Sequence, residues 1–132
     1  MRDFRKLEIW NKGITIVKKI YTLTETLPDK EKFGLISQMQ RCAVSIPSNI
    51  AEGCSRNSEK EYKRFLEIAI GSAFELETQL IICCELSYIN KEEIQGLQED
   101  LNTLQKQTNT LISIIAKSQQ RIAKGQKPTA NS

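Results

Sequence analysis

Four stretches of the chain repeat apolar residues at alternating steps of three and four, a spacing that places side chains on one face of an α-helix. The stretches cover about residues 7–27, 29–53, 58–87 and 90–123. The first carries two neighbouring stripes, one from Leu7 to Thr24 and the other from Ile16 to Leu27. No strand pattern, internal repeat or glycine-rich phosphate loop accompanies them. The sequence therefore predicts an all-α protein.

Local signals mark where these helices begin and end. Pro28 is expected to end the first helix, because the residue before a proline is pushed out of the α region. Asp29 is a good N-cap for the second helix. Ser58 and Glu61 form a capping box at the start of the third, and Asn90 is expected to cap the fourth.

The stretch "SIPSNIAEG" at residues 45–53 combines helical periodicity with residues that disturb helices. The apolar row from Ile36 to Ile50 continues through Pro47, which lacks an N–H group for the carbonyl of Ala43. We therefore expect a kink at Pro47 in the second helix. Gly53 fits the left-handed position that often follows a helix C-terminus.

Four amphipathic helices with short connectors predict an antiparallel up-down-up-down four-helix bundle. The alternative is an extended pair of two-helix hairpins, which would need a partner chain to cover each face. Residues 1–123 are expected to form one domain, and residues 124–132 a disordered basic C-terminal tail. The additional apolar stripes exceed what one bundle core uses, so we expect a homo-oligomer.

The chain lacks the residues that most enzymes use. It has no histidine, so the commonest general base and metal ligand is absent, and we predict no catalytic residue, no metal, no cofactor and no small-molecule substrate. Its four cysteines form no CxxC motif and are expected to be apolar residues in a reducing compartment. No secretory signal or bilayer-spanning apolar run occurs, which favours a cytoplasmic protein without a membrane partner.

Charge is distributed unevenly along the chain. Residues 1–20 sum to +4, residues 21–100 to −6 and residues 101–132 to +5, for a net charge of +3. Because the first and last helices of such a bundle are neighbours, their basic residues could share a face that suits nucleic acid. A solvated helix face with a frayed tail is the alternative. The candidate contacts are Arg2, Arg5, Lys6, Lys12, Lys18, Lys19, Lys117, Arg121 and Lys124, to which Lys106 and Lys127 could add.

A second group of polar residues follows the apolar row of the second helix and faces the third. We expect a structural polar network between these helices, with Arg41 or Arg64 tied to Glu52 or Glu75. The network either sets the register of the two helices or faces a subunit interface or ligand groove. Its predicted members are Arg41, Ser45, Asn49, Glu52, Arg64, Ser72 and Glu75.

The same residues carry a family resemblance. The motif "SIPSNIAEG", followed by "RFLEIAIGSAFELET", resembles the four-helix-bundle proteins encoded by intervening sequences of bacterial 23S rRNA genes, a ribosomal-protein-like family. The resemblance covers about residues 3–120. It implies a cytosolic, ring-shaped homopentamer without catalytic residues. The architecture is also similar to the accessory bundle proteins of retroelements, which bind nucleic acid and a reverse transcriptase.

Two functional hypotheses follow. The first is a non-enzymatic homo-oligomeric bundle that binds RNA, or else DNA, through basic surfaces. The second is a protein–protein interaction scaffold without nucleic-acid binding. The aromatic residues lie on or near apolar rows, which disfavours sequence-specific recognition of single strands by base stacking.

Overall fold

The computed structural model describes residues 2–125, and this part of the chain contains four long helices and no β-strand. The all-α prediction is thus confirmed. Residues 126–132, which make up most of the predicted tail, lie outside the described residues. The elements in chain order are η1 (Phe4–Lys6), α1 (Glu8–Thr24), η2 (Asp29–Glu31), α2 (Leu35–Cys54), α3 (Glu59–Glu85) and α4 (Lys91–Ala123).

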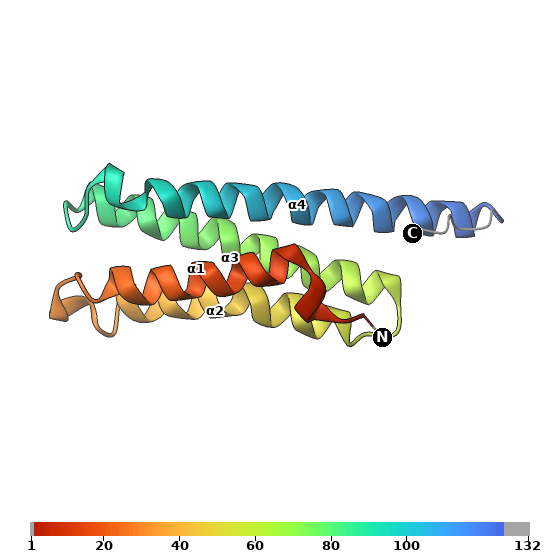
Figure 1. Cartoon of the computed structure of the whole chain (residues 1–132), viewed down its shortest axis with the longest axis horizontal. Helices are drawn as coiled ribbons and strands as arrows, with labels where there is room; N and C mark the ends of the chain where they lie inside the picture. Colours follow the sequence, from red (N-terminus) through yellow and green to blue (C-terminus); the bar gives the residue numbers. More distant parts are fainter. Residues whose placement is uncertain (1, 126–132) are drawn as a thin grey trace.

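The four helices pack side by side as one bundle. Figure 1 shows that each helix runs back alongside the one before it, with connectors at alternating ends. Contacts join α1 to α2, α2 to α3, α3 to α4, and α4 back to α1, so the helices form a closed ring around the core. No helix within residues 2–125 is both long enough and apolar enough to cross a membrane.

The two apolar stripes of α1 have different environments. Ile16 and Ile20 are fully buried in the core, and Leu23 is nearly so. The other stripe is only partly covered, and its Tyr21 is 44% exposed. The helix ends at Thr24, three residues before the predicted end, where the Thr24 hydroxyl bonds the carbonyl of Tyr21.

The predicted start of α2 at Asp29 is wrong. Residues Asp29–Glu31 form the short 3₁₀ helix η2, and α2 begins only at Leu35. The Glu31 carboxylate explains the shift, because its Oε1 accepts from the Leu35 backbone N–H at 3.3 Å. Its other oxygen accepts from the Tyr88 hydroxyl at 2.9 Å, which ties this connector to the one between α3 and α4.

Pro47 lies inside α2 and is buried against α1. A Cβ on Gly13 of α1 would lie 3.2 Å from the Pro47 Cβ, so the missing side chain lets α1 approach the proline ring. The helix continues through Pro47 to Cys54, and the kink there remains a prediction.

The left-handed role predicted for Gly53 is also wrong. Gly53 lies within α2 and is buried. A Cβ built there would lie 2.9 Å from the Phe65 Cβ and 3.1 Å from Cδ1 of Tyr62, both on α3. Gly53 therefore allows α2 and α3 to approach each other closely; the glycine with positive φ among the described residues is Gly125, at 76°.

The starts of α3 and α4 agree with their predicted caps. The Ser58 hydroxyl accepts from the Glu61 backbone N–H at 3.1 Å, and the Asn90 side chain accepts from the Glu93 N–H at 2.9 Å. Because both caps act within one turn of chain, short-range sequence sufficed to predict them. The largest fully buried side chains come from all four helices: Ile16, Ile20, Met39, Ile46, Ile50, Leu66, Leu76, Leu80, Ile94, Leu101, Leu104 and Thr108.

Candidate nucleic-acid interface

Charged side chains are divided unevenly between the two ends of the bundle. We define the basic end as residues 2–7, 48–68 and 104–125, which contain the N-terminal segment, the α2–α3 connector and the second half of α4 (Figure 1). It carries eleven basic and five acidic side chains. The remaining described residues, 8–47 and 69–103, carry seven basic and eleven acidic ones. The formal charge is therefore +6 over the basic end and −4 over the remaining described residues.

Arg2 belongs to the basic end but is held in place by neighbouring groups. Its guanidinium forms an ion pair with Glu59, donates to the Arg56 carbonyl at 3.3 Å and lies 4.0 Å from the centre of the Tyr62 ring. These contacts anchor the N-terminal segment on the start of α3. Arg2 therefore has an evident structural role, and its charge is largely offset.

Lys12 and Lys19 on α1 bracket a single carboxylate on α4. The Lys19 Nζ lies 2.6 Å from one Asp100 oxygen, and the Lys12 Nζ lies 3.8 Å from the other. The Asp100 side chain is only 19% exposed, which limits screening of both pairs. The two lysines thus join α1 to α4, and only one of their two charges is left without compensation.

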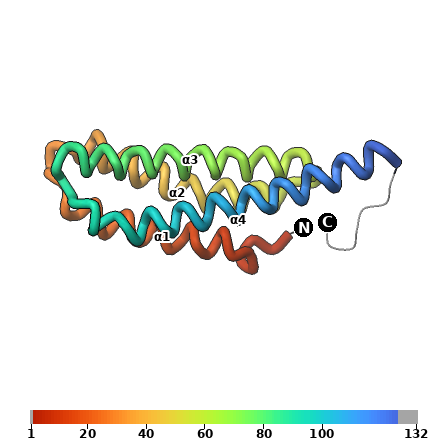
Figure 2. Tube along the Cα trace, turned by 90° about the horizontal axis from the view of Figure 1, so that it is seen from above, coloured from red at the N-terminus to blue at the C-terminus, as the bar shows by residue number. Residues whose placement is uncertain are grey.

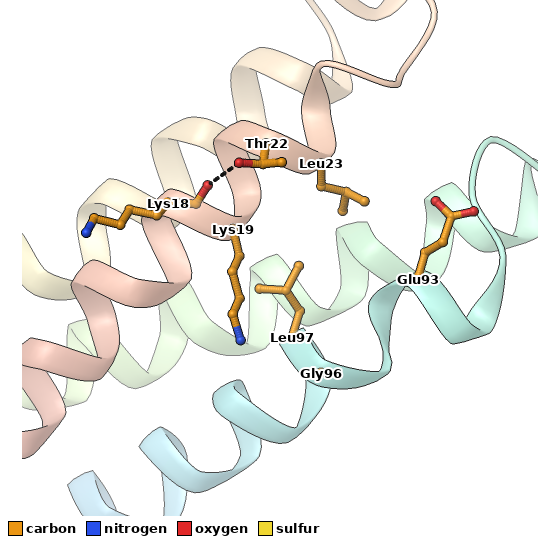
Figure 3. Close-up of a pocket in the computed structure, with 7 residues that line it drawn as sticks. All are labelled: Lys18, Lys19, Thr22, Leu23, Glu93, Gly96 and Leu97. Atoms are coloured by element: carbon orange, nitrogen blue, oxygen red, sulfur yellow. Dashed lines mark hydrogen bonds between the residues drawn. The ribbon is translucent and has the colours of Figure 1, made fainter.

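Lys18 and Lys19 also line a groove between α1 and α4, with a volume of about 420 Å³. In Figure 3, Lys19 and Leu97 point toward each other across this groove, whereas Lys18 points away from α4. Gly96 leaves the α4 side open, because nothing lies within 4 Å of where its Cβ would be. The groove is about 30 Å from Lys117 along α4, at 1.5 Å per residue.

The other predicted contacts lie at the basic end. Arg5 is exposed and lies 3.6 Å from the Asp3 carboxylate, and Lys6 is exposed beside it. Lys117 is exposed near the end of α4, Lys124 is exposed directly after it, and Arg121 is half-buried between them. The nine predicted residues therefore do not share one face: Lys12, Lys18 and Lys19 lie apart from the other six.

Three basic residues of this end were missed by the sequence reasoning. Arg56 lies in the α2–α3 connector, and Lys60 and Lys63 lie in the first two turns of α3. Arg56 pairs with Glu52 at 2.7 Å, whereas Lys60 is exposed. The sequence places them in its acidic middle section. Only the folding of the chain brings them next to both basic termini.

Part of the predicted polar network is present between α2 and α3. The Ser45 and Ser72 hydroxyl groups are 2.8 Å apart. The Asn49 side-chain amide donates to the Ser45 carbonyl at 2.8 Å and to the Ser45 hydroxyl at 2.9 Å. These bonds link the middle of α2 to the middle of α3, at the point where Pro47 leaves the α2 backbone short of one donor.

The charged part of the network is not formed, and this expectation is corrected. Arg41, Glu52, Arg64 and Glu75 are all exposed, and no ion pair within residues 2–125 joins either arginine to either carboxylate. Glu52 pairs instead with Arg56, one turn further along the chain. Exposed side chains gain little from pairing across helices, so the nearer partner is preferred.

The cysteines of the described chain are all free thiols. Cys42 and Cys83 are buried, and burial raises the pKa of each thiol to about 11, with the nearby Glu75 carboxylate contributing at Cys42. Burial also raises the pKa of Cys54. No group of three or more histidine, cysteine, aspartate or glutamate side chains within residues 2–125 is placed to hold a metal ion.

The fold and its charge distribution define a class: a four-helix-bundle protein with one basic end. Within this class, the chain belongs to the 23S rRNA-intervening sequence protein family, whose model matches residues 5–110. The match agrees with the resemblance carried by residues 45–53.

A solved structure shares the fold. It is a protein of unknown function from the S23 ribosomal protein family of Bacteroides thetaiotaomicron, 26% identical to this chain, with a TM-score of 0.73. The alignment covers 79% of this chain and 97% of that one. No curated protein matches the chain. Neither the family description nor that of the structure names an enzymatic activity.

Proposed function

We propose that this protein is a non-enzymatic, self-associating bundle that binds nucleic acid, RNA in the first place, through its basic end. The observation that carries the proposal is the uneven distribution of charge, +6 over the basic end and −4 over the remaining described residues. A net charge of only +3 would attract a polyanion weakly if it were spread evenly. The +6 charge of the basic end instead creates a local positive potential that attracts phosphates.

RNA is favoured over other polyanions by the family to which the chain belongs. The description of that family connects its members with intervening sequences of 23S rRNA. The fold by itself does not assign a ligand, because one bundle architecture serves many functions. The family and the charge distribution are independent observations, and they agree.

The binding proposal is tested by fluorescence anisotropy with a labelled RNA hairpin at 50 mM salt. We expect saturable binding at micromolar protein that weakens steeply toward 200 mM salt, since phosphate contacts release counterions. The absence of binding, or binding that does not depend on salt, would contradict a phosphate-based interface. The scaffold alternative would then be preferred.

Self-association is supported by the outward face of α3. Large apolar side chains that lie exposed together on one side of a helix often mark an interaction surface. Ile68, Phe74, Ile81 and Ile82 of α3 are between 39% and 54% exposed, although none of them lies at a chain end. Gly71 on the same face has nothing within 4 Å of where its Cβ would be. A second copy of the chain would cover this surface, and the family resemblance suggests a pentamer.

Light scattering of the purified protein tests self-association. We expect a mass that is a multiple of 15.1 kDa. The double variant I68K/I82K should reduce the mass toward that of a single chain while retaining its helical circular dichroism, because both positions are partly exposed within the bundle. A single-chain mass for the unaltered protein would reject self-association.

A further inference from the structure

The last turns of α4 differ from the rest of the molecule in shape. Both views show α4 extending past the ends of the other three helices, beyond the start of α3 (Figures 1 and 2). The helix is 33 residues long, which corresponds to about 50 Å. Its final turns therefore project from the basic end as a single helix.

The composition of this segment is also distinct. From Leu101 to Gly125 there is no acidic residue and no aromatic residue. Lys117 and Arg121 lie four residues apart, on one face of α4, and Lys124 directly follows Ala123, the last residue of the helix. Within residues 2–125, none of these three side chains forms an ion pair.

Stabilisation of the helix dipole by basic residues does not account for this distribution of charge along α4. Basic residues in the last turn of a helix stabilise its negative end, which would explain Arg121 and Lys124. It does not explain Lys117, nor the absence of any acidic residue over the twenty residues before Arg121. It also gives no reason for the helix to continue past the bundle.

The absence of aromatic side chains restricts the mode of binding. Proteins that hold single strands stack bases on aromatic rings, whereas duplexes are contacted largely through their phosphates. A helix end that carries Lys117 and Arg121 one turn apart, and Lys124 directly after its last residue, suits a row of phosphates. We propose that the projecting end of α4 contacts the phosphate backbone of a nucleic-acid duplex through Lys117, Arg121 and Lys124.

This assignment rests on the proposed function and narrows it. It gives Lys12 and Lys19 no part in binding, because Asp100 holds both against α4. The projecting end also lies outside residues 5–110, the part of the chain that the family model matches. The proposed contact thus lies in a part of the chain that the family match does not cover.

Two charge-matched variants test the assignment. K117Q/R121Q/K124Q removes three cations from the projecting end, and K30Q/K32Q/K91Q removes three from the opposite end. Glutamine is a good helix former, and circular dichroism checks that both variants fold. Each is titrated against an RNA hairpin, a DNA hairpin of the same sequence and an unstructured RNA of equal length.

We expect the first variant to bind both hairpins about tenfold or more weakly, with a salt slope smaller by about two to three, and the control to bind like the parent. Three results would overturn the assignment while leaving nucleic-acid binding intact. The two variants could lose affinity equally, the first variant could bind like the parent, or the parent could prefer the unstructured RNA to the hairpins. Failure of the parent to bind any of the three ligands would overturn the proposed function itself.

Discussion

Gly53→Val is expected to lower the free energy of unfolding by about 2–3 kcal/mol, the upper part of the range for overpacked sites. Even a Cβ at residue 53 would lie 2.9 Å from the Phe65 Cβ, which is fixed to the α3 backbone and cannot rotate away. The Tyr62 ring, at 3.1 Å, blocks the other direction. Valine adds two methyl groups, so α2 and α3 must separate at the end where residues 55–58 connect them.

Gly96→Ala is the matched control for this substitution. Gly96 also lies inside a helix, but nothing is found within 4 Å of where its Cβ would be. Alanine there should raise the stability by about 0.5–1 kcal/mol, because glycine is a poor helix former. Urea unfolding of both variants measures the difference. If Gly53→Val unfolds at the same urea concentration as the parent, the close approach of α2 and α3 at Gly53 is wrong.

The second large effect is expected at alkaline pH. Cys42 and Cys83 keep their protons in the folded chain up to a pKa of about 11, whereas the ordinary value is 9.0. Between pH 9 and 11 the unfolded chain therefore binds fewer protons than the folded chain, and stability must fall as pH rises. Each thiol contributes a loss of about 1.4 kcal/mol per pH unit in this window, and none below it.

The measurement is the free energy of unfolding from pH 8 to 11 for the parent and for Cys42→Ala/Cys83→Ala. The double variant will be less stable at pH 8, because it loses two buried sulfur atoms. Its stability should nevertheless decline less steeply above pH 9. Lysine and tyrosine titrate in both proteins, so they cancel in the comparison. Identical slopes would show that the two thiols are not kept neutral by burial.

Local sequence chemistry was sufficient for some features of the fold. Ser58 and Asn90 were correctly predicted as caps, because a cap acts on an N–H group three residues away. The start of α2 was not predictable in this way. There, Glu31 is fixed by Tyr88, which is 57 residues further along the chain, and it is Glu31 that accepts from Leu35.

Packing between helices explains the remaining differences. Gly53 has the sequence context of a left-handed cap, but contact with Phe65 makes it a helical packing position. The two stripes of α1 look equivalent in the sequence, and only the neighbouring helices place Ile16 in the core and Tyr21 at the surface. Periodicity predicts which residues share a face, but not which face a partner covers.

The candidate site, too, was predictable from the sequence only in part. Its basic residues were recognised from composition, yet their pairing depends on tertiary distances. Asp100 is 81 residues from Lys19 in the sequence but 2.6 Å away in the fold. Lys60 and Lys63 join the basic end because α3 begins there. The projection of α4 depends on where the other three helices end.

Hydrogen–deuterium exchange with and without an RNA hairpin tests whether RNA binds at the basic end, because it locates the bound surface without changing the protein. We expect slower exchange on RNA binding in peptides that cover residues 113–125, with a smaller effect in residues 2–7, which lie at the same end of the bundle. Residues 25–34 and 86–92, at the opposite end of the bundle, should exchange at unchanged rates. Protection confined to residues 25–34 and 86–92, or no change in exchange at saturating RNA, would contradict binding at the basic end.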